Sequence, residues 1–246
     1  MMRSHRRMTA LLLSSGLAAC AGACLDPGLT LRAEPLAEPA AAQPVEASSA
    51  AAPAEHAATS QPAPAEASPL TLLDNFHAIV DGQAYRSAQV RPETLEYAAR
   101  THGVRVVINL RGENPDEPWY QRERAACDAL GLQMIDVRFG SSELPAPQEL
   151  LKLYDAFVAA DGPLLMHCHS GADRSSMAAA LWRMIVLQEE AATAAQRELS
   201  LRYGYLRPRR PAMADMVDMF VPDRGWIVNE YPRRYAEYNE RQRTRH

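Results

Sequence analysis

The chain has 246 residues, of which 47% are hydrophobic, and it carries a formal net charge of −4 at pH 7. This negative charge argues against a nucleic acid as partner, because a nucleic-acid-binding surface needs an excess of basic side chains. The seven histidines and four cysteines show no paired metal-ligand spacing, so we expect neither a metal nor another cofactor.

The chain begins with the pattern of a bacterial export signal. Three arginines within the first seven residues precede an apolar stretch of about ten residues, which is too short to cross a bilayer that needs about 20. Residues 17–20, Leu-Ala-Ala-Cys, resemble a bacterial lipobox. We therefore expect residues 1–19 to be a lipoprotein-type signal peptide and Cys20 to be the lipidated first residue of the mature protein. A plain signal peptide, cut at an Ala-rich site, is the alternative.

The segment that starts at Cys20 bears on where the protein works. In the lipid-sorting pattern of Gram-negative bacteria, a residue other than Asp after the lipidated cysteine implies the outer membrane, and here it is Ala21. The expected location is the periplasmic face of the outer membrane, with the lipid anchor as the only membrane contact. Residues 20–70 are rich in Ala, Pro and Glu and contain no aromatic side chain, which predicts a disordered tether.

The remaining residues, 71–246, are enough for one domain with a sizeable core. Apolar runs bounded by turn residues predict strands, and longer runs that open with Pro predict helices. The expected elements in chain order are strands His77–Val80 and Ala84–Arg86, helix Pro92–His102, strand Val104–Leu110, helix Pro118–Leu130, a strand ending at Val137, helix Pro147–Ala160, strand Pro163–Met166, and helices Ser175–Leu187, Glu189–Tyr203, Pro211–Phe220 and Tyr231–Gln242. This alternation predicts an α/β fold, a three-layer sandwich with a largely parallel central sheet flanked by helices.

Residues 167–175, His-Cys-His-Ser-Gly-Ala-Asp-Arg-Ser, are the most informative segment of the chain. A cysteine and an arginine bracket five residues that include a glycine, between an apolar run and a helix-forming run. A tight loop between a strand and the start of a helix turns backbone N–H groups into an anion cradle. A thiol at the floor of a phosphate cradle can attack phosphorus, so Cys168 is the predicted nucleophile.

The residue types of this loop suit phosphate chemistry, because the charge of a phosphate monoester must be neutralised before a nucleophile can attack it. Arg174 offers a planar, two-pronged donor for two phosphate oxygens. The helix N-terminus, the loop amides and this guanidinium favour the thiolate form of Cys168. Ser175 can hydrogen-bond the sulfur and ease its departure. The predicted phosphate-binding residues are His169, Ser170, Gly171, Ala172, Asp173 and Arg174.

The pattern His-Cys, five residues, Arg-Ser is the signature of the cysteine-based protein tyrosine phosphatase superfamily, and the chain resembles a bacterial member of its dual-specificity branch. The resemblance extends from about Phe76 to about Tyr205 and includes residues 84–89, Ala-Tyr-Arg-Ser-Ala-Gln, and 103–111, Gly-Val-Arg-Val-Val-Ile-Asn-Leu-Arg. It implies a dual-specificity-phosphatase-like fold. It also implies hydrolysis of phosphorylated proteins, phosphoinositides or inositol phosphates through a phosphocysteine intermediate, with His167 orienting the loop.

The general acid that protonates the leaving group is left open among three carboxyl groups. The dual-specificity branch takes an Asp from a loop upstream of the cysteine. Asp136, 32 residues before Cys168, fits that spacing, although it belongs to an expected strand, and the loop after this strand offers Glu143 and no Asp. An Asp directly before the signature arginine, as Asp173 is, is implicated in acid catalysis in some bacterial and lipid phosphatases. We rank Asp173 first, Asp136 second and Glu143 third.

Two other functions fit the cradle: a phosphate-binding module that has lost turnover, and a sulfurtransferase of rhodanese type. The His before Cys168 and the Ser after Arg174 favour a phosphatase over a sulfurtransferase. Two side chains outside the motif also have alternatives. Arg111 either reaches the phosphate pocket or lies in solvent, and Cys127 either packs in a helix or forms a reversible disulfide with Cys168 in an oxidising compartment.

Overall fold

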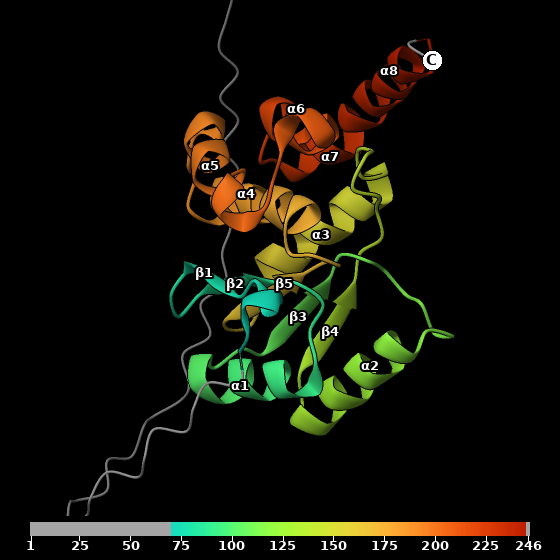
Figure 1. Cartoon of the computed structure of the whole chain (residues 1–246). Helices are drawn as coiled ribbons and strands as arrows, with labels where there is room; N and C mark the ends of the chain where they lie inside the picture. Colours follow the sequence, from blue (N-terminus) through green and yellow to red (C-terminus); the bar gives the residue numbers. More distant parts are fainter. Residues whose placement is uncertain (1–69, 245–246) are drawn as a thin grey trace, which may run out of the picture. The chain divides into compact units, whose positions relative to one another are not determined.

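A computed structural model describes residues 70–244 (Figure 1). The predicted signal peptide of residues 1–19, the predicted lipidation site Cys20 and all but the last residue of the predicted tether lie outside the described residues. A compact unit spans Gln61–His246 and includes every described residue. Between residues 70 and 244, no helix is both long and apolar enough to cross a bilayer.

Five short strands of the described chain form one sheet, in the order β1-β2-β5-β3-β4. β1 (His77–Val80) runs antiparallel to β2 (Ala84–Ser87). β2, β5 (Leu164–His167), β3 (Val106–Asn109) and β4 (Gln133–Asp136) are parallel to one another. β5, the strand that leads into the signature loop, therefore lies in the middle of the sheet.

The parallel strands end at one edge of the sheet in matched register. Ser87 and Asn109 each pair with His167, and Asp136 pairs with Asn109. In an open parallel sheet, ligands bind outside the carboxyl ends of the strands. Because of this register, the segments that follow β2, β3 and β4 lie at the same edge of the sheet as the loop that follows β5.

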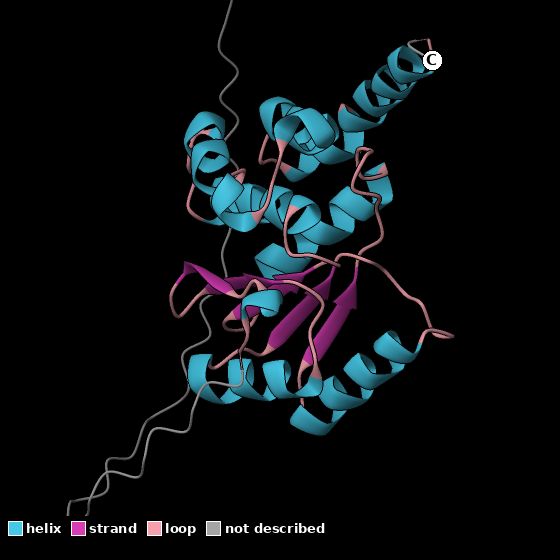
Figure 2. Cartoon of the chain, in the orientation of Figure 1, coloured by secondary structure: helices cyan, strands magenta, loops and turns pink. Residues whose placement is uncertain are grey.

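Helices cover both faces of this sheet (Figure 2). α1 (Pro92–His102) and α2 (Pro118–Leu130) lie on one face, and each ends at a glycine in the left-handed conformation. The opposite side carries the other helices: α3 (Pro147–Ala159), α4 (Asp173–Val186), α5 (Ala191–Glu198), α6 (Pro211–Met219), α7 (Arg224–Asn229) and α8 (Tyr231–Arg243). The predicted three-layer α/β sandwich with a largely parallel sheet is confirmed.

Two hydrophobic clusters fill the space between the layers. Along β5, Leu164 and Met166 belong to the larger cluster with α3 and α4, whereas Leu165 belongs to the smaller cluster with α1 and α2. Side chains of a strand alternate between two faces, and because both faces are buried here, the first three residues of β5 are all apolar and only its last, His167, is polar. In α4, 11 of 14 residues are buried. Because this helix is packed on nearly all sides, the position of its first turn, and of the loop that leads into it, is fixed.

The predicted helix Glu189–Tyr203 is wrong in its last third, after Glu198. α5 ends at Glu198, and a short 3-10 turn, η2 (Leu201–Tyr203), follows. The side chain of Glu198 is buried and accepts hydrogen bonds from two arginines of the interior. The chain then turns, so that Tyr203 covers Arg86, whose guanidinium carbon lies 4.0 Å from the centre of the tyrosine ring.

Candidate active site

The signature loop links β5 to α4 and packs against the end of β2. It runs from Cys168 to Ala172, and α4 begins at Asp173. Gly171 adopts a φ of +71°, and a Cβ at this position would lie 2.7 Å from the amide nitrogen of Ala88. Only glycine fits here, because the left-handed backbone and the close approach both disfavour a side chain. The backbone of the loop is thus held directly on the backbone that follows β2.

Cys168, the predicted nucleophile, lies at the start of this loop and is 2% exposed. Its thiol is free, and so is that of Cys127, the other cysteine within the described residues. Cys127 lies in the smaller core cluster, where burial raises the pKa of its thiol to about 12. A thiol that ionises with such difficulty is a poor partner for disulfide exchange. The structure therefore favours the packed alternative for Cys127.

Two guanidinium groups reach the region of Cys168. Arg174, on the first turn of α4, donates to the carbonyl oxygens of Leu110 (3.2 Å) and Phe139 (3.3 Å), which follow β3 and β4. Burial and then the charge of Arg174 lower the pKa of Arg111, whereas the neighbouring Cys168 opposes this shift. An anion bound between the two guanidinium groups would relieve their repulsion. Of the two alternatives for Arg111, the structure favours the one that directs it toward the site.

Ser175 follows Arg174 on the first turn of α4. Its side chain is buried, and the hydroxyl donates to the carbonyl oxygen of Ser87 (3.3 Å). In this structure the hydroxyl thus bonds the end of β2, and its predicted bond to the departing sulfur of Cys168 stays a prediction. The bond to Ser87 joins the start of the helix to the strand on which the signature loop rests.

A buried carboxylate lies behind the signature histidine. Glu123 of α2 is 1% exposed; one of its oxygens lies 2.6 Å from Nε2 of His167, and the other accepts a hydrogen bond from Gln89 (2.6 Å). Gln89 in turn accepts one from Arg111 (2.6 Å), whose guanidinium carbon lies 3.5 Å from the centre of the Trp119 ring. His167, Glu123, Gln89 and Arg111, here named the Glu123 cluster, connect the signature histidine with the second guanidinium of the site.

A second buried carboxylate lies behind the middle of the loop. Glu198 is 1% exposed and accepts hydrogen bonds from Arg86 (3.0 Å) and Arg183 (2.7 Å). Arg86, which is fully buried in β2, also donates to the carbonyl oxygen of Gly171 (2.8 Å) and to the hydroxyl of Ser176 (2.6 Å). Burial lowers the pKa of Arg86, and the charge of Glu198 opposes this shift. Glu198, Arg86 and Arg183, here named the Glu198 cluster, hold the glycine of the loop from the interior.

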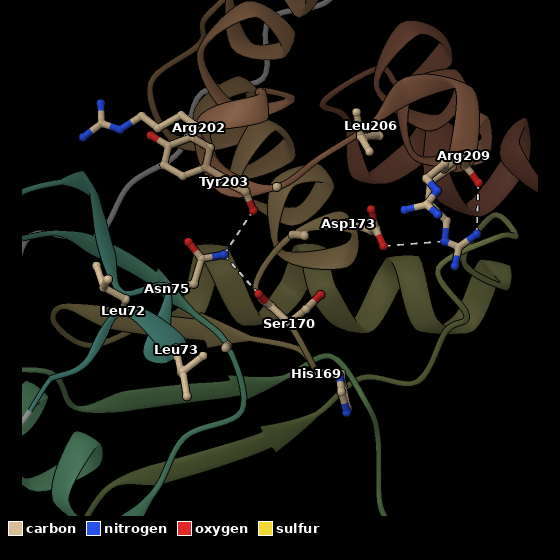
Figure 3. A pocket seen from close by; sticks show the side chains of 14 residues that line it. Leu72, Leu73, Asn75, His169, Ser170, Asp173, Arg202, Tyr203, Leu206 and Arg209 are labelled. Atoms are coloured by element: carbon tan, nitrogen blue, oxygen red, sulfur yellow. Dashed lines mark hydrogen bonds and ion pairs between the residues drawn. The ribbon is translucent and has the colours of Figure 1, made fainter.

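Asn75 ties the outer side of the loop to the segment that follows α5 (Figure 3). Its side-chain amide donates to the carbonyl oxygens of Ser170 (3.0 Å) and Tyr203 (3.1 Å). Its backbone is left-handed, with a φ of 43°, a conformation that asparagine adopts more readily than most residues. The loop is therefore supported at three places: by Glu123 behind the strand end, by Arg86 at the glycine and by Asn75 at the serine.

Asp136, the second-ranked general acid, is fully engaged in hydrogen bonds. Its carboxylate accepts them from Asn109 (2.7 Å), Tyr120 (2.7 Å) and Arg124 (3.0 Å). Since β4 is separated from β5 by β3, the backbone of Asp136 is roughly 10 Å from that of His167. Three donors fix the orientation of this carboxylate, which suits a residue that holds the end of the sheet.

Of the other two candidate acids, Glu143 lies in the loop after β4 and Asp173 is the first residue of α4. Glu143 is exposed and accepts a hydrogen bond from the amide of Gly140 (3.0 Å), so it closes its own loop. Asp173 has a side chain 22% exposed, 3.5 Å from Nε of Arg210. Burial raises the pKa of Asp173, although the charges of Arg210 and Arg174 oppose the shift. A carboxyl group that keeps its proton to a higher pH than usual suits general acid catalysis.

A pocket of about 860 Å³ opens beside the signature loop (Figure 3). The loop lines one side of it and the segment after α5 lines another, so residues distant in sequence share one opening. The loop residues in its wall are His169, Ser170, Ala172 and Asp173, and the basic residues in its wall are Arg202, Arg209 and Arg210. The pocket thus joins four of the predicted phosphate-binding residues to a positively charged segment.

Sequence reasoning did not identify four residues that support the loop: Asn75, Arg86, Glu123 and Glu198. Arg86 lies in the run 84–89 that carries the family resemblance, so this run held a signal. The other three contact partners 44 to 128 positions away, and their local sequence shows no motif. Within residues 70–244, no group of three or more His, Cys, Asp or Glu side chains could hold a metal.

A family model described as DSP-PTPase phosphatase fused to NAD+ kinase matches residues 74–207, more than half of the chain. Among solved structures, TpbA of P. aeruginosa is 19% identical, with 71% of this chain and 98% of that chain covered and a TM-score of 0.50, a likeness that shows the fold alone. The core catalytic domain of the PP-IP phosphatase SIW14 of S. cerevisiae is also 19% identical, with 67% and 93% covered and a TM-score of 0.49. No curated protein matches the chain.

Proposed function

The chain belongs to the DSP-PTPase phosphatase family, and on this premise we propose that it hydrolyses phosphate monoesters through a phosphocysteine intermediate on Cys168. The observation that carries the proposal is the position of this thiol. It lies buried between the carboxyl end of β5 and the start of α4, in a loop whose Gly171 permits close backbone packing. Backbone N–H groups at such a turn, together with Arg174 and Arg111, would neutralise a bound phosphate dianion.

In the first step, the thiolate of Cys168 attacks phosphorus. The sulfur–phosphorus bond forms while the bond from phosphorus to the leaving oxygen breaks, and Asp173 gives its proton to that oxygen. The loop amides and Arg174 bind the equatorial oxygens, on which the charge of the transition state is spread.

In the second step, water attacks the phosphorus of the phosphocysteine. The Asp173 carboxylate takes a proton from this water, the sulfur–phosphorus bond breaks, and inorganic phosphate is released while Cys168 returns to the thiolate. The hydroxyl of Ser175, which donates to Ser87 in the free enzyme, can turn to the departing sulfur and stabilise its charge.

Asp173 is better suited to act as the general acid than Asp136 or Glu143. Asp173 lines the pocket and its pKa is raised by burial. The carboxylate of Asp136 accepts three hydrogen bonds, and that of Glu143 accepts one from the amide of Gly140. Of the three, only Asp173 combines a raised pKa with a place in the wall of the pocket.

The first test is turnover of an aryl phosphate by the wild type and by Cys168→Ser. The proposal expects turnover by the wild type and none by the variant. A wild type that binds inorganic phosphate or vanadate without turnover would instead be a phosphate-binding module. Transfer of sulfur from thiosulfate to cyanide would identify a sulfurtransferase. Either result would overturn the proposal.

A pH profile tests the general acid. Because the pKa of Asp173 is raised, its carboxyl should keep its proton above the usual range, and kcat should fall once the pH exceeds this pKa. With an alkyl phosphate, whose leaving group needs a proton, Asp173→Asn should lower kcat by about 10²–10⁴-fold and remove this alkaline decline. Asp136→Asn is the matched control and should keep the decline. An unchanged profile in Asp173→Asn would assign the acid to another residue.

We further propose that Cys20 carries a lipid and that the phosphatase domain works on the periplasmic face of the outer membrane. The lipobox-like residues 17–20 and Ala21 support this proposal. Its substrate would be a phosphorylated protein, lipid or small molecule of the cell envelope. Metabolic labelling with a palmitate analogue should mark the wild type and spare Cys20→Ala, and equal labelling of both would remove the anchor.

A further inference from the structure

Three of the four exposed leucines of the described chain line the pocket beside the signature loop. Leu72 is 101% exposed, Leu73 88%, Leu201 72% and Leu206 38%. Leu72, Leu73 and Leu206 line the pocket, and Leu201 directly precedes Arg202, which lines it too (Figure 3). Single exposed apolar residues are ordinary, but a group of leucines around one opening is typical of a binding surface.

The same opening is positively charged. Arg202 and Arg209 line it, and neither forms an ion pair with any described residue. Arg207 and Arg210 add two more guanidinium groups, which pair with Asp218 (2.7 Å) and Asp173 (3.5 Å). The chain as a whole carries a net charge of −4, so this basic segment is a local feature of the pocket mouth.

We propose that this mouth, formed by Leu72, Leu73 and Leu206 with Arg202 and Arg209, docks on an anionic phospholipid surface. Leucines beside unpaired arginines are the combination that binds the interface of a bilayer, where acyl chains take the apolar side chains and lipid phosphates take the charge. Burial of one leucine in the bilayer raises the partition coefficient by about tenfold or more. An arginine near an anionic surface adds about fivefold.

This docking has a consequence for the substrate, which rests on the proposed function. The docked surface would face the pocket wall that contains His169 and Ser170 of the signature loop. Phosphate groups presented by the lipid surface, on lipids or on molecules bound there, would then lie next to Cys168. The docking itself depends neither on catalysis nor on a lipid attached to Cys20.

The test is sedimentation of residues 61–246, the compact unit that contains both core clusters, with lipid vesicles. This segment lacks Cys20 and the export signal, and a cooperative thermal unfolding transition will confirm that it is folded. The expected result is binding to vesicles of phosphatidylcholine mixed with phosphatidylglycerol and much weaker binding to pure phosphatidylcholine. Leu72→Ser with Leu73→Ser should lower the partition coefficient about 100-fold or more. Arg202→Gln with Arg209→Gln should lower the partition coefficient about 25-fold.

Matched controls use exposed residues away from the pocket. Val158 (63% exposed) and Val186 (41%) lie near the start of β5, at the opposite edge of the sheet from the signature loop. Val158→Ser with Val186→Ser, and Arg122→Gln with Arg241→Gln, should bind vesicles as the wild type does. Cys168→Ser should also bind vesicles normally while it loses turnover, which separates the docking proposal from the proposed function.

Three results would overturn the docking proposal. The first is absence of binding to the anionic vesicles. The second is an equal loss in the control variants, which would mean that no particular surface is used. The third is a self-associated protein that the leucine substitutions convert to monomers without any effect on vesicle binding, because the leucines would then cover a second copy of the chain.

Discussion

The Glu123 cluster and the Glu198 cluster support the same loop from two sides, but the partners of the two carboxylates differ. Glu198 lies between two arginines, and Arg183 also donates to the carbonyl oxygen of Ile79 (2.6 Å). The partners of Glu123 are a histidine and a glutamine, and the charged end of that cluster, Arg111, is only partly buried. The carboxylate of Glu198 thus balances the charge of two arginines in the interior. The carboxylate of Glu123 connects the interior with Arg111 at the site.

The difference predicts that Glu198 supports mainly folding and that Glu123 supports mainly catalysis. Without its carboxylate, the Glu198 cluster would leave guanidinium groups buried without their counter-charge, which weakens the fold. Without its carboxylate, the Glu123 cluster would loosen the histidine beside Cys168 and, through Gln89, the guanidinium of Arg111. A displaced catalytic group lowers the rate far more than it lowers stability.

The largest effect on stability is expected for Glu198→Gln. This change keeps the shape of the side chain and leaves Arg86 buried without a counter-charge, so the free energy of unfolding should fall by about 3–5 kcal/mol. Urea denaturation measures this loss. Glu96→Gln, which breaks the exposed pair with Arg100, is the control and should cost less than about 1 kcal/mol. Equal losses in the two variants would mean that the Glu198 cluster does not stabilise the fold.

The second prediction concerns Gly171→Ala, at the glycine that Arg86 holds. The left-handed backbone and the contact with Ala88 should together cost about 2–4 kcal/mol, and the displaced loop should lower kcat by about 100-fold. Gly103 has a similar φ of +65°, but a Cβ added there would meet nothing within 4 Å. Gly103→Ala should therefore lose stability only and keep its kcat. Normal turnover in Gly171→Ala would contradict the close packing of the loop.

Among the three variants around the signature loop, Glu123→Gln should lose the least stability, about 1.5–3 kcal/mol, because its partners are His167 and Gln89 and no buried arginine loses its counter-charge. Its kcat, however, should fall by roughly tenfold or more, since the histidine next to Cys168 loses its anchor. A full pH profile of kcat is the readout, because a merely structural role would leave its shape unchanged. If Glu123→Gln lowers stability as much as Glu198→Gln does and leaves kcat unchanged, the two clusters do not differ in role.

Much of the fold follows from the sequence. Helices Pro92–His102 and Pro118–Leu130 begin and end where the sequence predicts, because proline and glycine mark their ends clearly. All five expected strands are present. The apolar runs of the inner strands β3 and β5 reflect burial on both faces, whereas the edge strands β1 and β4 are partly exposed. α7 was not predicted; it begins after Asp223, whose side chain accepts a hydrogen bond from the amide of Trp226 (2.7 Å), and its six residues are too few to show a helical period.

The candidate site was predictable only in part. The signature loop could be read directly, since its residues are contiguous and their chemistry is specific. Its supports could not, because Glu123, Glu198 and Asn75 are polar residues whose partners the fold brings from distant parts of the chain. The bond of Ser175 to Ser87 depends on the pairing of β2 with β5, which sequence spacing alone does not reveal.

The central claim is that Cys168 carries the phosphoryl group during turnover, and the most direct test is to trap that intermediate. Wild-type protein turning over an aryl phosphate would be denatured rapidly, digested and examined by mass spectrometry. The account predicts one phosphoryl group on the peptide that contains Cys168 and none on that of Cys127. A phosphoryl group on another residue, or steady turnover with no phosphorylated peptide and undiminished activity in Cys168→Ser, would contradict it.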